Sequence, residues 1–149
     1  MIYVGIDPGQ KGGYAIIAKS ETGRSVFAYP WSDVFFTFEM AALKGQDVIV
    51  AVEKVGARPG QGTVSMFNFG KSAGYIEGVL SALGIPYQLI PPQTWKREFS
   101  LIGKDKKTSI ETCQKLFPDI DLKRTERCKT GSDGKAEALL IALYAERHL

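Results

Sequence analysis

The sequence predicts an α/β fold, in which helices flank a mixed five-stranded sheet within one domain that spans residues 1–149. Three short apolar segments near the N-terminus are separated by turn residues, a pattern typical of an antiparallel three-stranded meander. An unbroken apolar run at residues 47–53 is typical of a strand buried on both faces, as in parallel sheets. Helical patterns follow, and 149 residues with 44% apolar side chains suit a single core.

The first strand, residues 1–7, is apolar and ends in the carboxylate of Asp7. Pro8 and Gly9 stop it, because proline cannot donate a sheet hydrogen bond and glycine admits the backbone angles of a tight turn. Gly12 and Gly13 are small enough to let an anion approach Asp7. The second and third strands of the meander are expected at residues 14–18 and 25–29.

A helix is expected next, capped by Ser32 or Asp33, running to about Leu43 and ended by Gly45. The apolar positions expected to cover the sheet are Val34, Phe35, Phe38 and Ala41 or Ala42. The fourth strand, residues 47–53, ends in a carboxylate like the first. If these two strands are parallel neighbours, Asp7 and Glu53 stand together at one edge of the sheet.

A glycine-rich loop at residues 54–62 places Lys54 and Arg58 beside Glu53. The helix expected from about residue 63 to 83 has more apolar positions than one buried stripe requires. Two interpretations stay open for the surplus: ordinary core, or contact with a partner subunit. The residues concerned are Met66, Phe67 and Phe69.

The C-terminal half continues with one strand and three helices. The strand is expected at residues 85–90, ended by Pro91 and Pro92, and a short helix follows at residues 93–99. A second helix at residues 105–117 is closed by Pro118. Residues 119–131 form a surface connection, and the last helix begins at Ser132 or Asp133.

Positive charge is concentrated in one third of the chain. The formal net charge is only +3, but residues 92–130 contain ten Lys or Arg against six Asp or Glu. This asymmetry indicates a polyanionic partner such as DNA. Lys104 or Lys107 would neutralise an attacked phosphate, and the other cations of the stretch would follow the DNA backbone.

The remaining composition excludes several classes of protein. Cys113 and Cys128 are too few for a disulfide framework, and the lone His148 argues against a histidine triad or a zinc site. The sequence contains no signal peptide and no long apolar run, so we expect a cytoplasmic protein with no membrane association.

Two further carboxylates, Asp133 and Glu137, are four residues apart and therefore share one face of the last helix. Structure alone explains them as a helix cap and a first-turn acid. Together with Asp7 and Glu53, which interrupt apolar strand ends, they predict an all-oxygen site for Mg²⁺ or Mn²⁺. Two such ions about 4 Å apart would support phosphodiester hydrolysis.

The chain resembles the RuvC-type Holliday junction resolvases of the RNase H-like superfamily, particularly the compact members found in phages. The resemblance covers nearly the whole chain and follows these motifs: Gly-Ile-Asp7-Pro-Gly, Val-Glu53-Lys-Val, Phe67-Asn-Phe-Gly-Lys71, Pro92-Gln-Thr-Trp-Lys96, Lys107 and Asp133-Gly-Lys-Ala-Glu137.

The resemblance implies a homodimeric, Mg²⁺-dependent endodeoxyribonuclease that acts in DNA recombination and repair, in a bacterial or phage-infected cell. It would resolve four-way junctions by paired symmetric nicks, with two ions per active site and Mn²⁺ able to substitute. The implied catalytic residues are Asp7, Glu53, Asp133 and Glu137, all metal ligands, and Lys107. The implied DNA-binding residues are Lys54, Arg58, Lys71, Lys96, Arg97, Lys104 and Lys106.

Two positions depart from the family pattern. Bacterial members have their last two acids three residues apart and both Asp, whereas Asp133 and Glu137 are four apart, which leaves the division of metal binding between them open. Bacterial members also carry a junction-inserting aromatic residue where this chain has Gly56. Candidates to replace it are Arg58, Met66, Phe67 and Phe69.

Other functions fit parts of the same pattern. A nuclease of this fold could act on forks or flaps, and a non-catalytic junction-binding protein would bind DNA without metal. A third interpretation treats Asp7-Pro-Gly with Gly12 and Gly13 as the phosphate loop of an actin-like or sugar-kinase ATPase. Those folds need two such domains, for which 149 residues leave no room.

Overall fold

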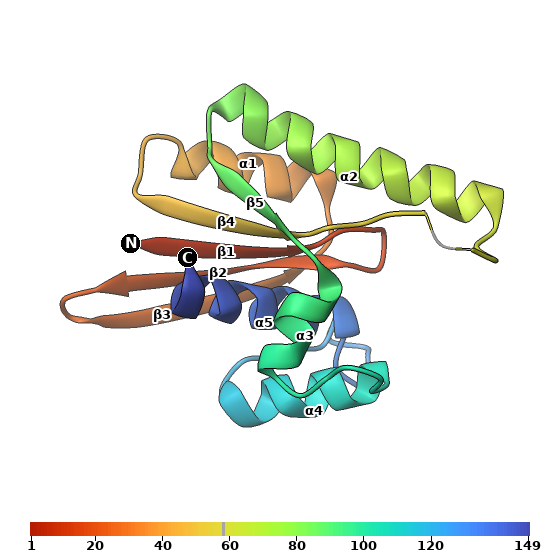
Figure 1. Ribbon diagram of the computed structural model, residues 1–149. Coiled ribbons are helices and arrows are strands. Elements are labelled where there is room, and N and C mark those ends of the chain that lie inside the picture. Colours follow the sequence, from red (N-terminus) through yellow and green to blue (C-terminus); the bar gives the residue numbers. More distant parts are fainter. Residues whose placement is uncertain (58) are drawn as a thin grey trace.

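The protein is described by a computed structural model, which covers residues 1–57 and 59–149. Its sheet has the strand order β3-β2-β1-β4-β5, antiparallel from β3 to β1 and parallel from β1 to β5 (Figure 1). The predicted mixed α/β architecture is thereby confirmed. The elements are β1 (Ile2–Asp7), β2 (Gly13–Ser20), β3 (Gly23–Pro30), α1 (Asp33–Leu43), β4 (Val48–Glu53), α2 (Thr63–Leu83), β5 (Tyr87–Ile90), α3 (Pro92–Glu98), α4 (Lys106–Leu116) and α5 (Asp133–His148).

The parallel register of β1 and β4 brings two carboxylates together. Ile6 lies opposite Val52, so the next residues along the two strands, Asp7 and Glu53, lie side by side where the strands end. Because side chains alternate across a strand, both acids point to the face opposite that of Ile6 and Val52. The predicted pairing of the first and fourth strands is confirmed.

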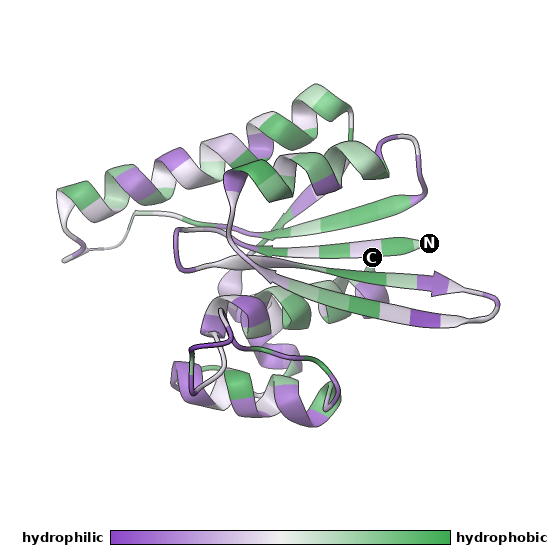
Figure 2. Cartoon of the chain, turned by 180° about the vertical axis from the view of Figure 1, so that it is seen from behind, coloured by the Kyte–Doolittle hydropathy of each residue, from purple (hydrophilic) through white to green (hydrophobic). Residues whose placement is uncertain are grey.

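Helices cover both faces of the sheet, giving three layers (Figure 1). Helices α1 and α2 pack on one face, where the core includes Phe36, Met40, Ile76 and Leu80. Helices α3, α4 and α5 cover the other face, the one to which Asp7 and Glu53 point. The hydropathy colouring in Figure 2 shows apolar residues along the central strands, between these layers.

Helix α5 lies unusually close to the sheet because glycines face it. A Cβ atom on Gly5 of β1 would lie 2.2 Å from the Ala138 carbonyl oxygen, and one on Gly134 would lie 2.2 Å from the Lys11 carbonyl oxygen. A Cβ on Gly13 would lie 3.0 Å from the Gly134 carbonyl oxygen. Gly13 therefore admits the backbone of α5, whereas Gly12 lines the cavity beside Asp7, where the expected approach of an anion stays a prediction.

Helix α1 packs through a different face from the predicted one. Val34, Phe35 and Phe38 are exposed, with Phe38 at 71%, whereas Phe36, Met40 and Leu43 are buried. The helix carries two apolar stripes, and aromatic contacts select between them. Phe36 packs edge-on against Tyr14, with ring centroids 5.5 Å apart, and so anchors its own stripe to the sheet.

Helix α2 reaches beyond the sheet at its N-terminal end (Figure 1). Its buried residues, Ala73, Ile76 and Leu80, all lie in its C-terminal half. In the N-terminal half Phe67 is 71% exposed and Phe69 36% exposed, so the interpretation of these rings as ordinary core is wrong. The N-terminal end of α2, which carries these rings, extends past the ends of the strands (Figure 1).

Element boundaries follow the prediction closely, with small differences in the strands. The β2–β3 hairpin is longer than expected, because Ser20 pairs with Gly23 across a two-residue turn. Strand β5 begins at Tyr87, two residues late, because the Ile85 amide still donates to the Leu80 carbonyl at the end of α2. Within the described residues, no helix is long and apolar enough to cross a membrane.

Candidate active site

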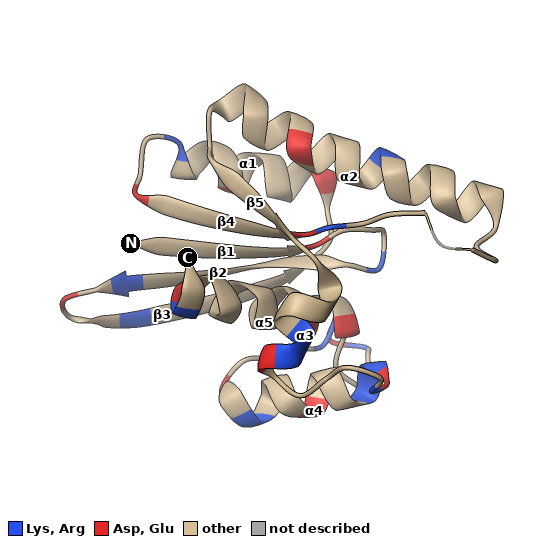
Figure 3. Ribbon diagram, in the orientation of Figure 1, with Lys and Arg blue, Asp and Glu red and all other residues tan. Residues whose placement is uncertain are grey.

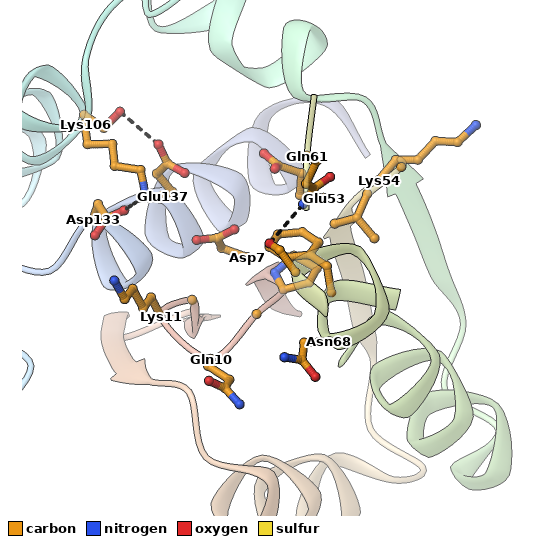
Figure 4. Close-up of a pocket in the computed structure, with 18 of the residues that line it drawn as sticks. Asp7, Gln10, Lys11, Glu53, Lys54, Gln61, Asn68, Lys106, Asp133 and Glu137 are labelled. Atoms are coloured by element: carbon orange, nitrogen blue, oxygen red, sulfur yellow. Dashed lines mark hydrogen bonds and ion pairs between the residues drawn. The ribbon is translucent and has the colours of Figure 1, made fainter. Parts of the chain in front are cut away.

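The four predicted acids line one cavity of about 850 Å³ (Figure 4). Asp7 ends β1, Glu53 ends β4, and Asp133 and Glu137 lie one turn apart at the start of α5. Three elements that are distant in the sequence therefore supply carboxylates to one place. The close contact between α5 and the glycines of β1 brings the helix within reach of the strand ends.

Asp7 lies at the centre of this negative charge. Burial raises the pKa of Asp7 well above its usual range, because it removes water from around the charged form. The negative charges of Glu137, Glu53 and Asp133 raise this pKa further. The Lys106 ammonium opposes this shift only partly. Excess negative charge around a buried carboxylate is the electrostatic condition that a bound cation relieves.

Glu53 is held by a buried tryptophan. The indole N–H of Trp95, on α3, donates a hydrogen bond of 2.7 Å to Glu53 Oε2, in a region from which solvent is excluded. Sequence reasoning assigned a role to Lys96 in the same motif but none to its neighbour Trp95. The available signal was the position of Trp95 in a short polar helix, where a fully buried tryptophan needs a partner for its N–H.

Cations and a hydroxyl contact the two acids of α5. The Lys106 ammonium donates to Asp133 Oδ2, and this hydrogen bond raises the pKa of Lys106. The Ser109 hydroxyl donates to Glu137 Oε1 at 3.2 Å, and the Lys96 ammonium lies 3.9 Å from the same oxygen. Positive charge thus sits beside this pair, as the repulsion between two acids on one helix face requires.

Lys106 and Lys107, the first two residues of α4, have exchanged the positions that the sequence predicted for them. Lys107, predicted to act at the attacked phosphate, does not line the cavity; its ammonium lies in solvent, 3.8 Å from Glu111. Lys106, predicted only to bind DNA, reaches the acids. The Asp105 side chain accepts a hydrogen bond from the Thr108 amide and so caps the start of α4. Because consecutive residues of a helix point about 100° apart, Lys106 and Lys107 face different directions.

The other predicted basic residues divide into two groups. Lys54, Lys96 and Lys104 line the cavity, although the Lys54 side chain points away from the acids (Figure 4). Lys71 and Arg97 are exposed and do not line it. The position of Arg58 lies outside the described residues.

Helix α2 forms one wall of the cavity. The Gly9 amide donates to Ser72 Oγ at 3.1 Å, which ties the turn after Asp7 to the helix. The Phe69 ring packs on the same glycine, 3.2 Å from where a Cβ would stand. At the rim, Gly56 faces open space, so no aromatic side chain projects from that point of the chain.

The donor set fits a hard divalent cation in its chemistry, since every candidate ligand is a carboxylate oxygen. As the side chains are arranged, however, no three acidic, histidine or cysteine side chains in the described part of the chain are close enough to hold one ion together. Binding a metal therefore requires the carboxylates to rotate toward one another.

Comparison of the sequence with protein-family models and with curated proteins gives no match. Comparison of the structure gives several. Thermus thermophilus RuvC in complex with a Holliday junction substrate matches with a TM-score of 0.58 and 18% identity, over 99% of this chain and 97% of that one. T. thermophilus RuvC in a second structure matches with a TM-score of 0.54 and 21% identity, over 99% and 96%.

The yeast mitochondrial Holliday junction resolvase Ydc2 matches with a TM-score of 0.52 and 16% identity, over 93% of this chain and 75% of that one. These likenesses establish the class of structure: the chain has an RNase H-like fold, as predicted. Within that class, its fold is the one shared by RuvC-type resolvases.

Proposed function

We propose that this protein is a divalent-metal-dependent endonuclease that resolves four-way DNA junctions by paired symmetric nicks. One observation carries the proposal: the ends of β1 and β4 and the first turn of α5 bring four carboxylates into one cavity on a RuvC-type fold. Structure alone does not favour four acids at this density, because burial and then the charges of the other three acids raise the pKa of Asp7.

Asp7, Glu53, Asp133 and Glu137 would hold the metal. When bound there, a divalent ion would supply an activated water as nucleophile and charge stabilisation for the departing 3′ oxygen, so that cleavage would leave 5′-phosphate and 3′-hydroxyl ends. Trp95 orients Glu53 for this task, and Ser109 orients Glu137. Mg²⁺ is the expected ion, with Mn²⁺ as a substitute, because carboxylate oxygens suit both.

Lysines around the acids would hold the scissile phosphate. The Lys106 ammonium already lies at Asp133 and needs only a side-chain rotation to meet a phosphate oxygen. Lys11, Lys54, Lys96 and Lys104 also line the cavity. Figure 3 shows further basic residues where α3, α4 and the segment before α5 meet. This distribution suits a DNA backbone that crosses the cavity.

A homodimer is the expected assembly, since two symmetric cuts need a twofold pair of sites. The outer faces of α1 and α2 supply a candidate interface. Phe35, Phe38 and Phe67 are exposed there, and exposed large apolar side chains that gather on one face mark interaction sites. Along α2, Gly70, Gly74 and Gly78 have open space at their Cβ positions, so a partner backbone can approach closely.

Cleavage of a synthetic four-way junction tests the proposal. The junction is compared with a fork, a flap and a plain duplex, each labelled on every strand, with Mg²⁺, with Mn²⁺ and with EDTA. Metal-dependent paired nicks at symmetric positions in the junction alone are expected. Equal cutting of forks and flaps would replace junction resolution by a broader branched-DNA activity, and metal-independent binding without cutting would favour the non-catalytic alternative.

A further inference from the structure

We propose that residues 123–131, here called the basic loop, form a second contact for the DNA backbone beside the active-site cavity. The proposal rests on the function proposed above and specifies where the DNA leaves the cavity. Sequence reasoning treated this segment only as a surface connection. Its charge, its anchoring and its position next to α5 give it a more specific use.

The basic loop carries a high density of exposed positive charge. It contains four cations, Lys123, Arg124, Arg127 and Lys129, against the single acid Glu126, and all five side chains are exposed. Among the described residues, no ion pair or hydrogen bond engages the side chains of Lys123, Arg127 or Lys129. Their charges are therefore available to phosphates along one edge of the molecule.

The loop is closed at its base, directly before the acids of α5. Lys123 pairs with Gly131 in an isolated bridge, and the Ser132 amide donates to the Leu122 carbonyl at 2.6 Å. Leu122 is buried, and a Cβ on Gly131 would lie 2.9 Å from the Ile110 side chain. The base is thus packed into the core two residues before Asp133, so the loop has a fixed position relative to that carboxylate.

A buried lysine of α5 holds the backbone at the start of the basic loop. Lys135, in the first turn of α5, is only 7% exposed, and its ammonium donates to the Asp121 carbonyl at 2.5 Å and the Lys123 carbonyl at 2.9 Å. A loop that serves only solubility needs no buried cation to order its backbone, whereas ordered charges bind a backbone at lower entropic cost.

A second contact joins the loop to the cavity rim. The Arg124 guanidinium donates to the Gln10 carbonyl at 3.1 Å, and Gln10 and Lys11 line the cavity (Figure 4). The loop cations and Lys11 therefore belong to one continuous edge that begins at the acids. DNA whose scissile phosphate lies at Asp7 would meet this edge on its way out of the cavity.

The loop also carries a natural probe, because Cys128 lies within it. Hydrogen bonds with Thr125 lower the pKa of the Cys128 thiol, whereas burial raises that of Cys113 to about 12. Alkylation with iodoacetamide should therefore modify Cys128 selectively. In EDTA, where no cutting occurs, saturating junction DNA is expected to slow this alkylation by at least about fivefold, through occlusion and through the negative potential of the phosphates.

Matched charge variants give an independent measurement. Arg127→Ala with Lys129→Ala should lower the slope of log affinity against log salt concentration by about two, roughly one for each lost phosphate contact. Lys44→Ala with Lys115→Ala removes the same charge from two exposed positions that do not line the cavity, the C-cap of α1 and the last turn of α4, and should change the slope little. Lys135→Met keeps every loop cation but should weaken binding and speed amide exchange in residues 123–131.

The outcomes separate the two proposals. Failure of the wild-type protein to bind the junction would overturn the proposed function. Wild-type binding with unprotected Cys128 and equal salt slopes for both double variants would overturn the loop contact alone. Protection of Cys128 by an acidic protein, but not by DNA, would also overturn it, by assigning the loop to a different class of partner.

Discussion

Trp95 donates its indole N–H to Glu53 Oε2 over 2.7 Å, and both groups are withdrawn from solvent, with exposures of 0% and 9%. An indole nitrogen can only donate a hydrogen bond. It therefore holds Oε2 of Glu53 toward α3, and this also sets the direction in which the second oxygen, Oε1, points. A charge-assisted hydrogen bond in such surroundings is stronger than one at the surface. The orientation of Glu53 thus depends on a residue that does not line the cavity.

Replacing this donor tests its role. Trp95→Phe keeps an aromatic ring but removes the N–H, and should weaken Mn²⁺ binding by roughly tenfold or more, since ligand-orienting hydrogen bonds contribute on that scale. The folded state should lose about 1.5–3 kcal/mol, the usual contribution of a hydrogen bond to a charged group. Calorimetric titration with Mn²⁺ and thermal melting in EDTA measure the two effects.

The matched control for Trp95 is the second tryptophan. Trp31 donates its N–H to Asp33 at 2.8 Å on the surface, away from the acids. Trp31→Phe should leave Mn²⁺ affinity unchanged. Equal Mn²⁺ affinity for Trp95→Phe and the wild-type protein would show that the hydrogen bond has only a structural role.

Asp7→Asn and Glu53→Gln separate chemistry from DNA binding. Each substitution removes one carboxylate charge from the proposed metal site, so cleavage of the four-way junction should fall by more than about a hundredfold. Affinity in EDTA should stay within about threefold of the wild-type value, because the lysines supply the backbone contacts. Gel-shift titration and single-turnover cleavage measure these two quantities, and a parallel loss of binding would contradict the separation.

The raised pKa of Asp7 predicts an unusual pH dependence of stability. Between the pKa of an unfolded aspartate and the raised folded value, the folded protein keeps a proton that the unfolded chain has lost. The contribution of Asp7 to the free energy of unfolding therefore falls as pH rises through the folded pKa. Without metal, Asp7→Asn should therefore stabilise the protein at pH 8, where the folded wild-type protein must either keep this proton or hold the charge at a cost.

Melting curves in EDTA from pH 5 to pH 8 measure this effect. The advantage of Asp7→Asn over the wild-type protein should grow with pH, and Mn²⁺ should reverse it by stabilising only the wild-type protein. An advantage that is constant with pH would assign the effect to packing instead of charge. Glu111→Gln, an exposed change outside the cavity, is the control for removal of one carboxylate.

Much of the fold follows from local signals. Apolar runs bounded by Pro8 and Gly9 or by Pro91 and Pro92 define strands, and a carboxylate that ends an apolar strand marks a place where structure alone prefers no charge. The convergence of Asp7 and Glu53 could be anticipated because parallel neighbours present their carboxyl ends together. These features depend only on the spacing of residues along the sequence, so they can be predicted without the structure.

What could not be predicted depends on long-range packing. Helix α1 carries two apolar stripes, and contacts of Phe36 with Tyr14 and Trp31 select the buried one. The close approach of α5 to Gly5 and Gly13, and the bond from Trp95 to Glu53, join segments that are distant in the sequence. No periodicity or motif spacing in the intervening chain reports such contacts.

The adjacent lysines of α4 provide an internal comparison. Lys106→Met removes the ammonium that contacts Asp133, whereas Lys107→Met removes one that lies in solvent near Glu111. Cleavage should fall roughly a hundredfold for the first, on the scale of losing one group that stabilises developing charge, and less than about threefold for the second. Single-turnover rates at saturating protein decide between them, and a larger loss for Lys107→Met would restore the sequence-based assignment.

The exposed aromatic face of α1 and α2 predicts the assembly state. Phe38→Glu with Phe67→Glu places charges on two side chains that are each 71% exposed, so the monomer should keep its melting temperature while the dimer dissociates. Sedimentation at micromolar concentration should show a dimer for the wild-type protein and for Phe27→Glu, a control on edge strand β3. The double variant should sediment as a monomer and produce single instead of paired nicks, because one subunit supplies one site. A wild-type monomer that still makes paired cuts would exclude this face as the basis of symmetric cleavage.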